Sequence, residues 1–160
     1  MHNFVAMLFF LDIDGVMVPA KAWKSPELMA DGFPTFSKRA IAALQNTISV
    51  DDTVMLTTSH KANYSIEEWK SIFKNRAISI NHISTLPENR ANLSRKEEIL
   101  NWFHANKVNE DFIIIDDDAS LHELPEYLKA NWIQTSPMIG LTDEHVAAIN
   151  ARHIVEEAAY

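Results

Sequence analysis

Acidic side chains follow two apolar segments of this sequence at short, regular spacings. Asp12 and Asp14 come directly after the apolar run 5–11, and three consecutive aspartates at 116–118 follow the run 112–115. Carboxylates brought together repel each other, at a cost of about 4 kcal/mol for one pair ~4 Å apart at an effective dielectric of 20. They are tolerated around a cation, and oxygen ligands without His or Cys favour magnesium. These acids therefore predict a Mg²⁺ site.

A lysine near a predicted helix start indicates that an anion is bound beside this metal. Ser94 is typical of a helix N-cap, which places Lys96 at the second helical position. The helix dipole disfavours a cation there by ~0.3–1 kcal/mol, so the lysine fits best where it neutralises a bound anion. The hydroxyls of Thr58 and Ser59 follow the second predicted strand and can donate hydrogen bonds to the same anion.

Short apolar runs alternate with helical patterns along the chain, and these elements must position the side chains named above. We predict strands at 5–11, 53–57, 77–80, 112–115 and 132–135. Helices are predicted after the capping residues Ser37, Ser65, Ser94 and Thr142. Buried strands that alternate with helices are typical of an α/β fold, here a Rossmann-like three-layer sandwich with a mainly parallel five-stranded sheet. In such sheets ligands bind beyond the carboxyl ends of the strands.

The composition fits one ordinary globular domain and excludes several kinds of site. A chain of 160 residues, 47% hydrophobic and 22% charged, can bury a core without a disulfide or a metal. It has no cysteine, which excludes a thiolate nucleophile and every cysteine-based zinc site. The net charge of −8 argues against a general nucleic-acid coat protein. The longest apolar run is too short to span a bilayer, so we expect a cytoplasmic protein without a membrane partner.

Together, these motifs resemble those of the haloacid dehalogenase (HAD) superfamily of phosphohydrolases. The matching pieces occur in the family's order and span most of the chain: residues 10–16 (FLDIDGV), 55–59 (MLTTS), Lys96 and 113–117 (IIIDD). The resemblance implies that Asp12 is a nucleophile that forms an aspartyl-phosphate, and that Asp14 protonates the leaving oxygen and later activates water. An aspartate at position 14 points to the phosphatases of the superfamily more than to its dehalogenases.

The same resemblance assigns a hydroxyl and a cation to the phosphate. Thr58 and Lys96 would orient the phosphoryl oxygens. Thr57 stays open as an alternative to Thr58 at the strand end, and Ser59 is a further candidate phosphate ligand. His60 follows these hydroxyls as a candidate substrate contact, and the alternative interpretation is a polar loop histidine.

The metal ligands implied by the resemblance lie after the first and fourth predicted strands. Mg²⁺ would be bound by Asp12, the backbone carbonyl of Asp14 and Asp117, with Asp116 in a supporting position. Because three aspartates are consecutive, the metal-binding pair can also shift by one residue to include Asp118.

Residues 17–36 separate the first strand from the first helix and are interrupted by three prolines and a glycine. Members of the superfamily usually carry a cap insertion, whereas this segment is long enough only for a short flap. We expect one domain over residues 1–160 and no separate cap domain. Trp23 lies in the flap beside two lysines and is a candidate for stacking on a base or sugar; the alternative interpretation is a buried hydrophobe.

Residues 133–137 and 140–142 are similar to the ending of small capless HAD domains associated with RNA repair proteins. The function predicted from the sequence is a Mg²⁺-dependent phosphomonoesterase acting on a small phosphorylated molecule or a nucleic-acid terminus. The alternative is a non-catalytic phosphate-binding or regulatory module with the same fold. A receiver-type signalling module fits less well, because its first acids are adjacent whereas Asp12 and Asp14 are spaced by one residue. The sequence does not predict the oligomeric state.

Overall fold

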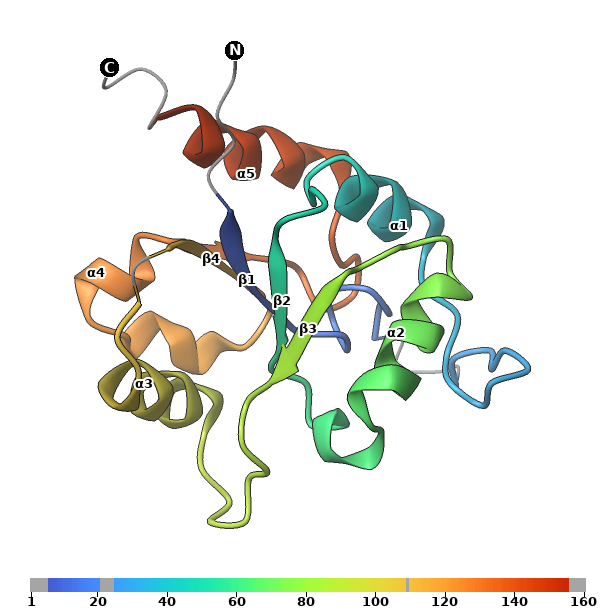
Figure 1. The fold of residues 1–160 in the computed structure, drawn as a ribbon, viewed down its shortest axis with the longest axis horizontal. Coiled ribbons are helices and arrows are strands. Elements are labelled where there is room, and N and C mark those ends of the chain that lie inside the picture. Colours follow the sequence, from blue (N-terminus) through green and yellow to red (C-terminus); the bar gives the residue numbers. More distant parts are fainter. Residues whose placement is uncertain (1–5, 21–24, 109, 156–160) are drawn as a thin grey trace.

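The computed structural model describes residues 6–20, 25–108 and 110–155 of the chain. Five strands form one sheet in the order β3-β2-β1-β4-β5, and every neighbouring pair is parallel (Figure 1). The strands are β1 (Met7–Leu11), β2 (Thr53–Leu56), β3 (His82–Thr85), β4 (Asp111–Asp116) and β5 (Trp132–Gln134). The predicted α/β fold with a Rossmann-like parallel sheet is therefore confirmed.

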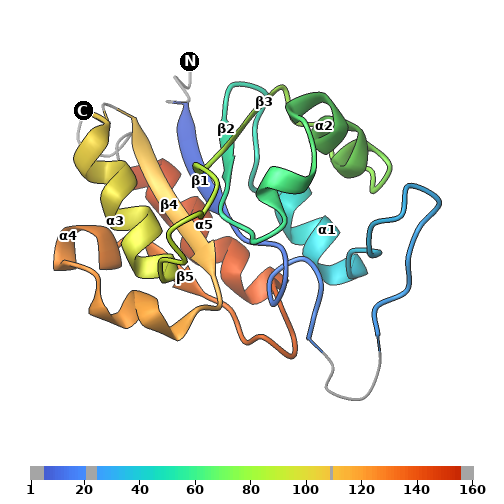
Figure 2. The same ribbon diagram turned by 90° about the horizontal axis from the view of Figure 1, so that it is seen from below.

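Helices cover both faces of this sheet, as Figure 2 shows from the side of the strands' carboxyl ends. They are α1 (Lys38–Gln45), α2 (Ile66–Lys74), α3 (Arg95–Ala105), α4 (Glu126–Lys129) and α5 (Asp143–Val155), with two short 3₁₀ turns, η1 (Lys61–Asn63) and η2 (Ala119–Glu123). The hydrophobic core has two parts: one lies under α1, α2 and α5, the other under α3, η2 and α4. Among the described residues, no helix has the length and apolar character needed to cross a membrane.

The central strand β1 is apolar throughout because it is covered on both faces. Phe9 packs in the part of the core under α1, α2 and α5, and Phe10 packs in the part under α3. The ring of Phe10 meets Trp102 and Phe103 of α3 at centroid distances of 5.1 and 5.2 Å. A run without polar residues is what a strand buried on both faces requires.

Two capping boxes fix the starts of α2 and α3, as predicted from the sequence. Ser65 accepts a hydrogen bond from the backbone N–H of Glu68, and the Glu68 carboxylate accepts one from the N–H of Ser65. Ser94 and Glu97 form the same pair at the start of α3. Each box satisfies two backbone donors that have no partner inside the helix, so each helix has a defined first residue.

The third strand lies at His82–Thr85 and not at residues 77–80, where the sequence analysis predicted it. Ala77 has a positive φ of 62° and ends the preceding helix, and the N–H of Ile78 returns to the carbonyl of Phe73. Ile78 is buried as part of this helix ending. Ile78 is therefore apolar because it packs against the core after a helix. A short apolar run in a sequence does not distinguish this case from a buried strand.

Residues 25–36 form a loop that is tied to the end of α2 by Arg76. The Arg76 guanidinium donates to both carboxylate oxygens of Asp31, at 2.6 and 3.0 Å, and to the backbone carbonyls of Phe33 and Pro34. The guanidinium also lies over the rings of Phe33 and Phe36. The described part of the predicted flap is thus anchored to the domain, and Trp23 lies outside the described residues.

The order of the strands reverses between β1 and β4, which lie side by side at the centre of the sheet. In open parallel sheets such a reversal leaves a crevice beyond the carboxyl ends of the two strands. Asp12 follows β1 and Asp116 ends β4, so the sheet brings both acids to this crevice.

Candidate active site

The sheet register places Asp12 between two polar residues of the neighbouring strands. Leu11 pairs with Leu56 on one side and with Ile115 on the other. The N–H of Asp12 then donates to the carbonyl of Ile115 at 3.1 Å. Thr57, which follows β2, and Asp116, which ends β4, therefore flank Asp12 at the carboxyl edge.

Three carboxylates gather at this point. One oxygen from each of Asp12, Asp116 and Asp117 lies within 4.8 Å of the other two, and the side chains of Asp12 and Asp116 are buried. Gly15 makes room for the third acid: it has a φ of +80°, and a Cβ there would lie 2.3 Å from Asp117 Oδ2. Only a residue without a side chain fits both the conformation and the space.

The pKa values of the buried acids show how unfavourable this gathering is for negative charge. Burial and repulsion from Asp116 raise the pKa of Asp12 to about 9. Burial also raises the pKa of Asp116, although the guanidinium of Arg95 opposes this rise. A divalent cation would favour the ionised carboxylates, and three acidic oxygens are donors that hard metal ions prefer. The cluster therefore has the chemistry of a metal site.

The cation that lies within the cluster is Arg95, the first residue of α3. Its Nη1 donates to Asp116 Oδ2 at 2.5 Å and to Thr57 Oγ1 at 3.2 Å, and it lies 3.4 Å from Asp12 Oδ1. Burial alone would lower the pKa of Arg95, but the nearby aspartates hold this pKa above its usual value. Arg95 was not among the residues predicted from the sequence.

Lys96, which the sequence analysis assigned to the phosphate, has its ammonium elsewhere. Lys96 Nζ lies 3.8 Å from the Glu123 carboxylate on η2, and its backbone N–H donates to Ser120 Oγ. Arg95 and Lys96 are adjacent at the start of one helix, so their side chains leave the helix axis in different directions. Arg95 shares a face with buried Ile99, four residues later, which directs it into the domain.

A second cation, Lys61, is buried behind Arg95. Lys61 Nζ lies 2.8 Å from Glu98 Oε2, and Glu98 Oε1 lies 3.7 Å from Arg95 Nε. The side chains of Lys61 and Glu98 are only 4% and 9% exposed. The sequence offered no spacing signal for this chain of charges, because Lys61 and Glu98 belong to elements far apart along the chain.

The hydroxyl within the cluster belongs to Thr57. Thr57 Oγ1 donates to Asp116 Oδ2 at 3.3 Å. Thr58 is also buried, but its hydroxyl accepts a hydrogen bond from the backbone N–H of His60 in the turn after β2. Ser59 is exposed in the same turn. The two threonines that the sequence left as alternatives therefore have different surroundings.

The acids at 117 and 118 also differ in position. Asp117 belongs to the carboxylate cluster, whereas Asp118 is the N-cap of η2 and accepts a hydrogen bond from the N–H of Ser120. Asp14 lies on the exposed side of the turn after β1, where its Oδ2 is 2.9 Å from Nε2 of His60. Asp14 and His60 thus meet from two different strand ends.

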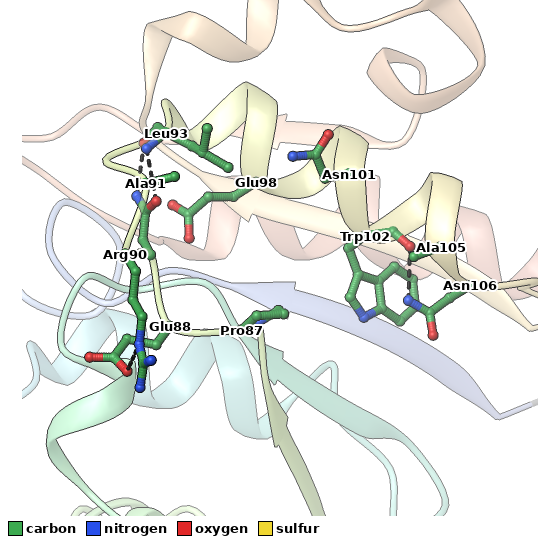
Figure 3. A pocket seen from close by; sticks show the side chains of 11 residues that line it. Pro87, Glu88, Arg90, Ala91, Leu93, Glu98, Asn101, Trp102, Ala105 and Asn106 are labelled. Atoms are coloured by element: carbon green, nitrogen blue, oxygen red, sulfur yellow. Dashed lines mark hydrogen bonds and ion pairs between the residues drawn. The ribbon is translucent and has the colours of Figure 1, made fainter.

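A pocket of about 400 Å³ opens between the segment that follows β3 and helix α3 (Figure 3). Apolar side chains form much of its wall, including Pro87, Leu93 and Trp102. The carboxylate of Glu98 also borders the pocket, which connects it to the Lys61 ion pair. None of the clustered aspartates is among its lining residues, so the pocket is beside the candidate active site and does not contain it.

The comparisons with known proteins identify one family. A family model described as the HAD domain in Swiss Army Knife RNA repair proteins matches residues 8–146. No curated protein and no solved structure matches the chain. The matched range contains the three clustered aspartates, Arg95 and the Asp14–His60 pair described above.

Proposed function

This chain belongs to the family of HAD domains in Swiss Army Knife RNA repair proteins, and we propose that it is a Mg²⁺-dependent phosphomonoesterase. The observation that carries this proposal is the cluster of Asp12, Asp116 and Asp117 with Arg95 at the reversal of strand order. A buried nucleophilic carboxylate beside a metal site and a fixed guanidinium suits the transfer of a doubly charged phosphoryl group.

The proposed reaction has two steps. An Asp12 oxygen attacks the phosphorus and forms an aspartyl-phosphate, while the bond from phosphorus to the leaving oxygen breaks and the Asp14 carboxyl gives its proton to that oxygen. Asp14 then takes a proton from water, whose oxygen attacks the phosphorus. The bond from phosphorus to the Asp12 oxygen breaks, inorganic phosphate leaves, and the Asp12 carboxylate is restored.

The proposed metal ligands are Asp12, Asp117 and the backbone carbonyl of Asp14, with Asp116 in a supporting position. When bound, Mg²⁺ supplies positive charge that offsets these acids and the charge of the transferred phosphoryl group. We assign the phosphate-orienting cation to Arg95 in place of Lys96, because Arg95 Nη1 lies 3.4 Å from Asp12 Oδ1. We assign the orienting hydroxyl to Thr57 for the same reason of proximity.

The proposed substrate is a phosphate monoester on a small molecule or on a nucleic-acid terminus. The side chains of Asp14 and His60 are more than one-third exposed, which leaves room for a leaving group larger than the phosphate itself. The family name refers to RNA repair proteins, so phosphorylated RNA ends belong in the panel of candidate substrates.

A phosphatase screen with Mg²⁺ tests the proposed function. The panel contains p-nitrophenyl phosphate, mononucleotides, sugar phosphates and oligonucleotides phosphorylated at the 3′ or 5′ end. We expect Mg²⁺-dependent release of phosphate by the wild type and a loss on the order of 10³-fold or more in D12N, because the nucleophile is removed.

Two neighbouring aspartates provide a matched control for the metal site. D117N should weaken the response to Mg²⁺, whereas D118N should retain it, because Asp118 caps η2 outside the cluster. Activity that persists in D12N would contradict the aspartyl-phosphate mechanism. Stabilisation by Mg²⁺ and phosphate without turnover of any substrate would instead favour a non-catalytic phosphate-binding module.

A further inference from the structure

His60 meets the side chain of Asp14, a residue to which the proposed reaction gives the acid role. Nε2 of His60 lies 2.9 Å from Asp14 Oδ2, although the two residues are 46 positions apart. We infer that His60 is a positioning residue for the general acid: its Nε2–H donates to one oxygen of Asp14 and leaves the other oxygen to carry the transferred proton. This inference rests on the proposed function.

The turn after β2 holds the backbone of His60 in place. Its N–H donates to Thr58 Oγ1 at 3.2 Å, and its carbonyl accepts a hydrogen bond from the N–H of Asn63 at 2.9 Å. Thr58 is buried, and the following Lys61 is fixed by Glu98. The histidine is therefore fixed on both sides of its own position, so its Cβ has a defined direction.

A second contact orients the imidazole ring. The ring lies edge to face with Phe33, with centroids 5.7 Å apart and planes at 84°. Phe33 is itself buried, packs edge to face on Trp69 and belongs to the loop anchored by Arg76. The ring is thus supported by a rigid apolar neighbour while Nε2 points to Asp14.

The Asp14–His60 contact has a geometry that suits catalysis better than stability. The Asp14 and His60 side chains are 56% and 38% exposed, and polar contacts this accessible contribute little to the stability of the fold. Alignment of an acid with the atom that it protonates has a larger effect, since a misplacement of about 1 Å can reduce a rate ~10²-fold. We therefore expect the Asp14–His60 contact to affect the rate of the step in which Asp14 protonates the leaving oxygen more than it affects folding.

The proton balance of the first step makes this role testable. The proton moves from the Asp14 carboxyl to the leaving oxygen as the phosphorus–oxygen bond breaks, and His60 neither gains nor loses a proton overall. A leaving group that is itself acidic departs as an anion and depends little on this transfer. Loss of the positioning residue should therefore slow the release of a poor leaving group more than that of a good one.

Two variants separate the hydrogen bond from the ring. H60F keeps an aromatic ring against Phe33 but has no donor, whereas H60Q keeps an N–H donor near the position of Nε2 without the ring. The probes are p-nitrophenyl phosphate and phenyl phosphate, which have similar shapes and differ in the acidity of the phenol released. H122F is the control for the same substitution at another histidine, because the ring of His122 packs on Trp132 and takes no part in the Asp14–His60 contact.

We expect H60F to lower kcat/KM for phenyl phosphate about tenfold more than kcat/KM for p-nitrophenyl phosphate, a part of the ~10²–10⁴-fold that general acids contribute. H60Q and H122F should keep the wild-type ratio of the two values. An unchanged ratio in H60F, or an equal loss in H60F and H60Q, would overturn the inference while the proposed function stands. A wild type without Mg²⁺-dependent turnover of either ester would overturn both.

Discussion

At the scale of single residues, Lys61 and Glu98 form a buried ion pair 2.8 Å long beside the carboxylate cluster. Glu98 lies one helical turn after Arg95, so its charge influences the guanidinium that reaches Asp12. Two buried charges stabilise a fold only while each has its partner. We therefore expect Lys61 to support the position of Arg95 without contacting the carboxylate cluster itself.

The variant K61M tests the contribution of this pair to stability. It removes the cation closest to the buried Glu98 carboxylate and leaves only the more distant Arg95 Nε at 3.7 Å, so we expect the free energy of unfolding to fall by about 3 kcal/mol. Urea unfolding at neutral pH measures this change. K70M is the control, because Lys70 and Glu67 form an exposed pair 3.8 Å apart that should contribute at most about 1 kcal/mol. Similar losses of unfolding free energy in K61M and K70M would show that the buried Lys61–Glu98 pair contributes no more to stability than the exposed Lys70–Glu67 pair.

At the scale of secondary-structure elements, helix α3 has a role that α2 does not share. Both helices begin with a Ser–Glu capping box, but in α3 the residue after the cap is Arg95. The position of the first helical turn therefore decides where the guanidinium lies. Loss of the Ser94 cap would loosen the same turn that presents Arg95 to Asp12.

Removal of each cap gives a matched pair of variants. S94A and S65A should each lower the free energy of unfolding by about 1 kcal/mol, since each removes one capping hydroxyl. We expect S94A also to lower phosphatase kcat several-fold, whereas S65A should keep it. Chemical denaturation and steady-state kinetics measure the two effects. Equal kcat values in S94A and S65A would show that the start of α3 does not position Arg95.

At the scale of the whole molecule, the loop 25–36 is joined to the domain by an interaction that depends on pH. Hydrogen bonds from Arg76 lower the pKa of Asp31 far below its usual range. An unfolded aspartate has a pKa of about 3.9, so above that pH both states are ionised and the contribution to stability is complete. As the pH falls below it, the unfolded state takes up the proton first, and stability is lost.

The variant D31N should remove this part of the acid sensitivity. Between pH 5 and pH 3 we expect the free energy of unfolding of the wild type to fall more steeply than that of D31N. D51N, at an exposed acid before β2, is the control and should follow the slope of the wild type. Parallel curves for the wild type and D31N would contradict the assignment of acid sensitivity to the Asp31–Arg76 pair.

Much of the fold could be predicted because its signals are local. The apolar run of β1 and the capping residues Ser65 and Ser94 are read from a few consecutive residues, and the structure confirms them. The third strand was misplaced because Ile78 and Ile80 are apolar for a different reason, namely burial after a helix end. A short apolar run in the sequence does not show which part of the fold its side chains pack against.

The sequence alone was enough to predict that aspartates stand at the ends of β1 and β4 and that the chain is a domain of the HAD type. The packing of the chain was needed to distinguish adjacent side chains: Arg95 and Thr57 contact Asp116, whereas Lys96 lies beside Glu123 and the Thr58 hydroxyl accepts from His60. The two side chains of each adjacent pair differ in the direction in which they leave the backbone. Adjacent residues point differently from a helix or strand, and the packing of that element against the sheet sets its rotation. The contact between Asp14 and His60 likewise exists only because two strand ends meet.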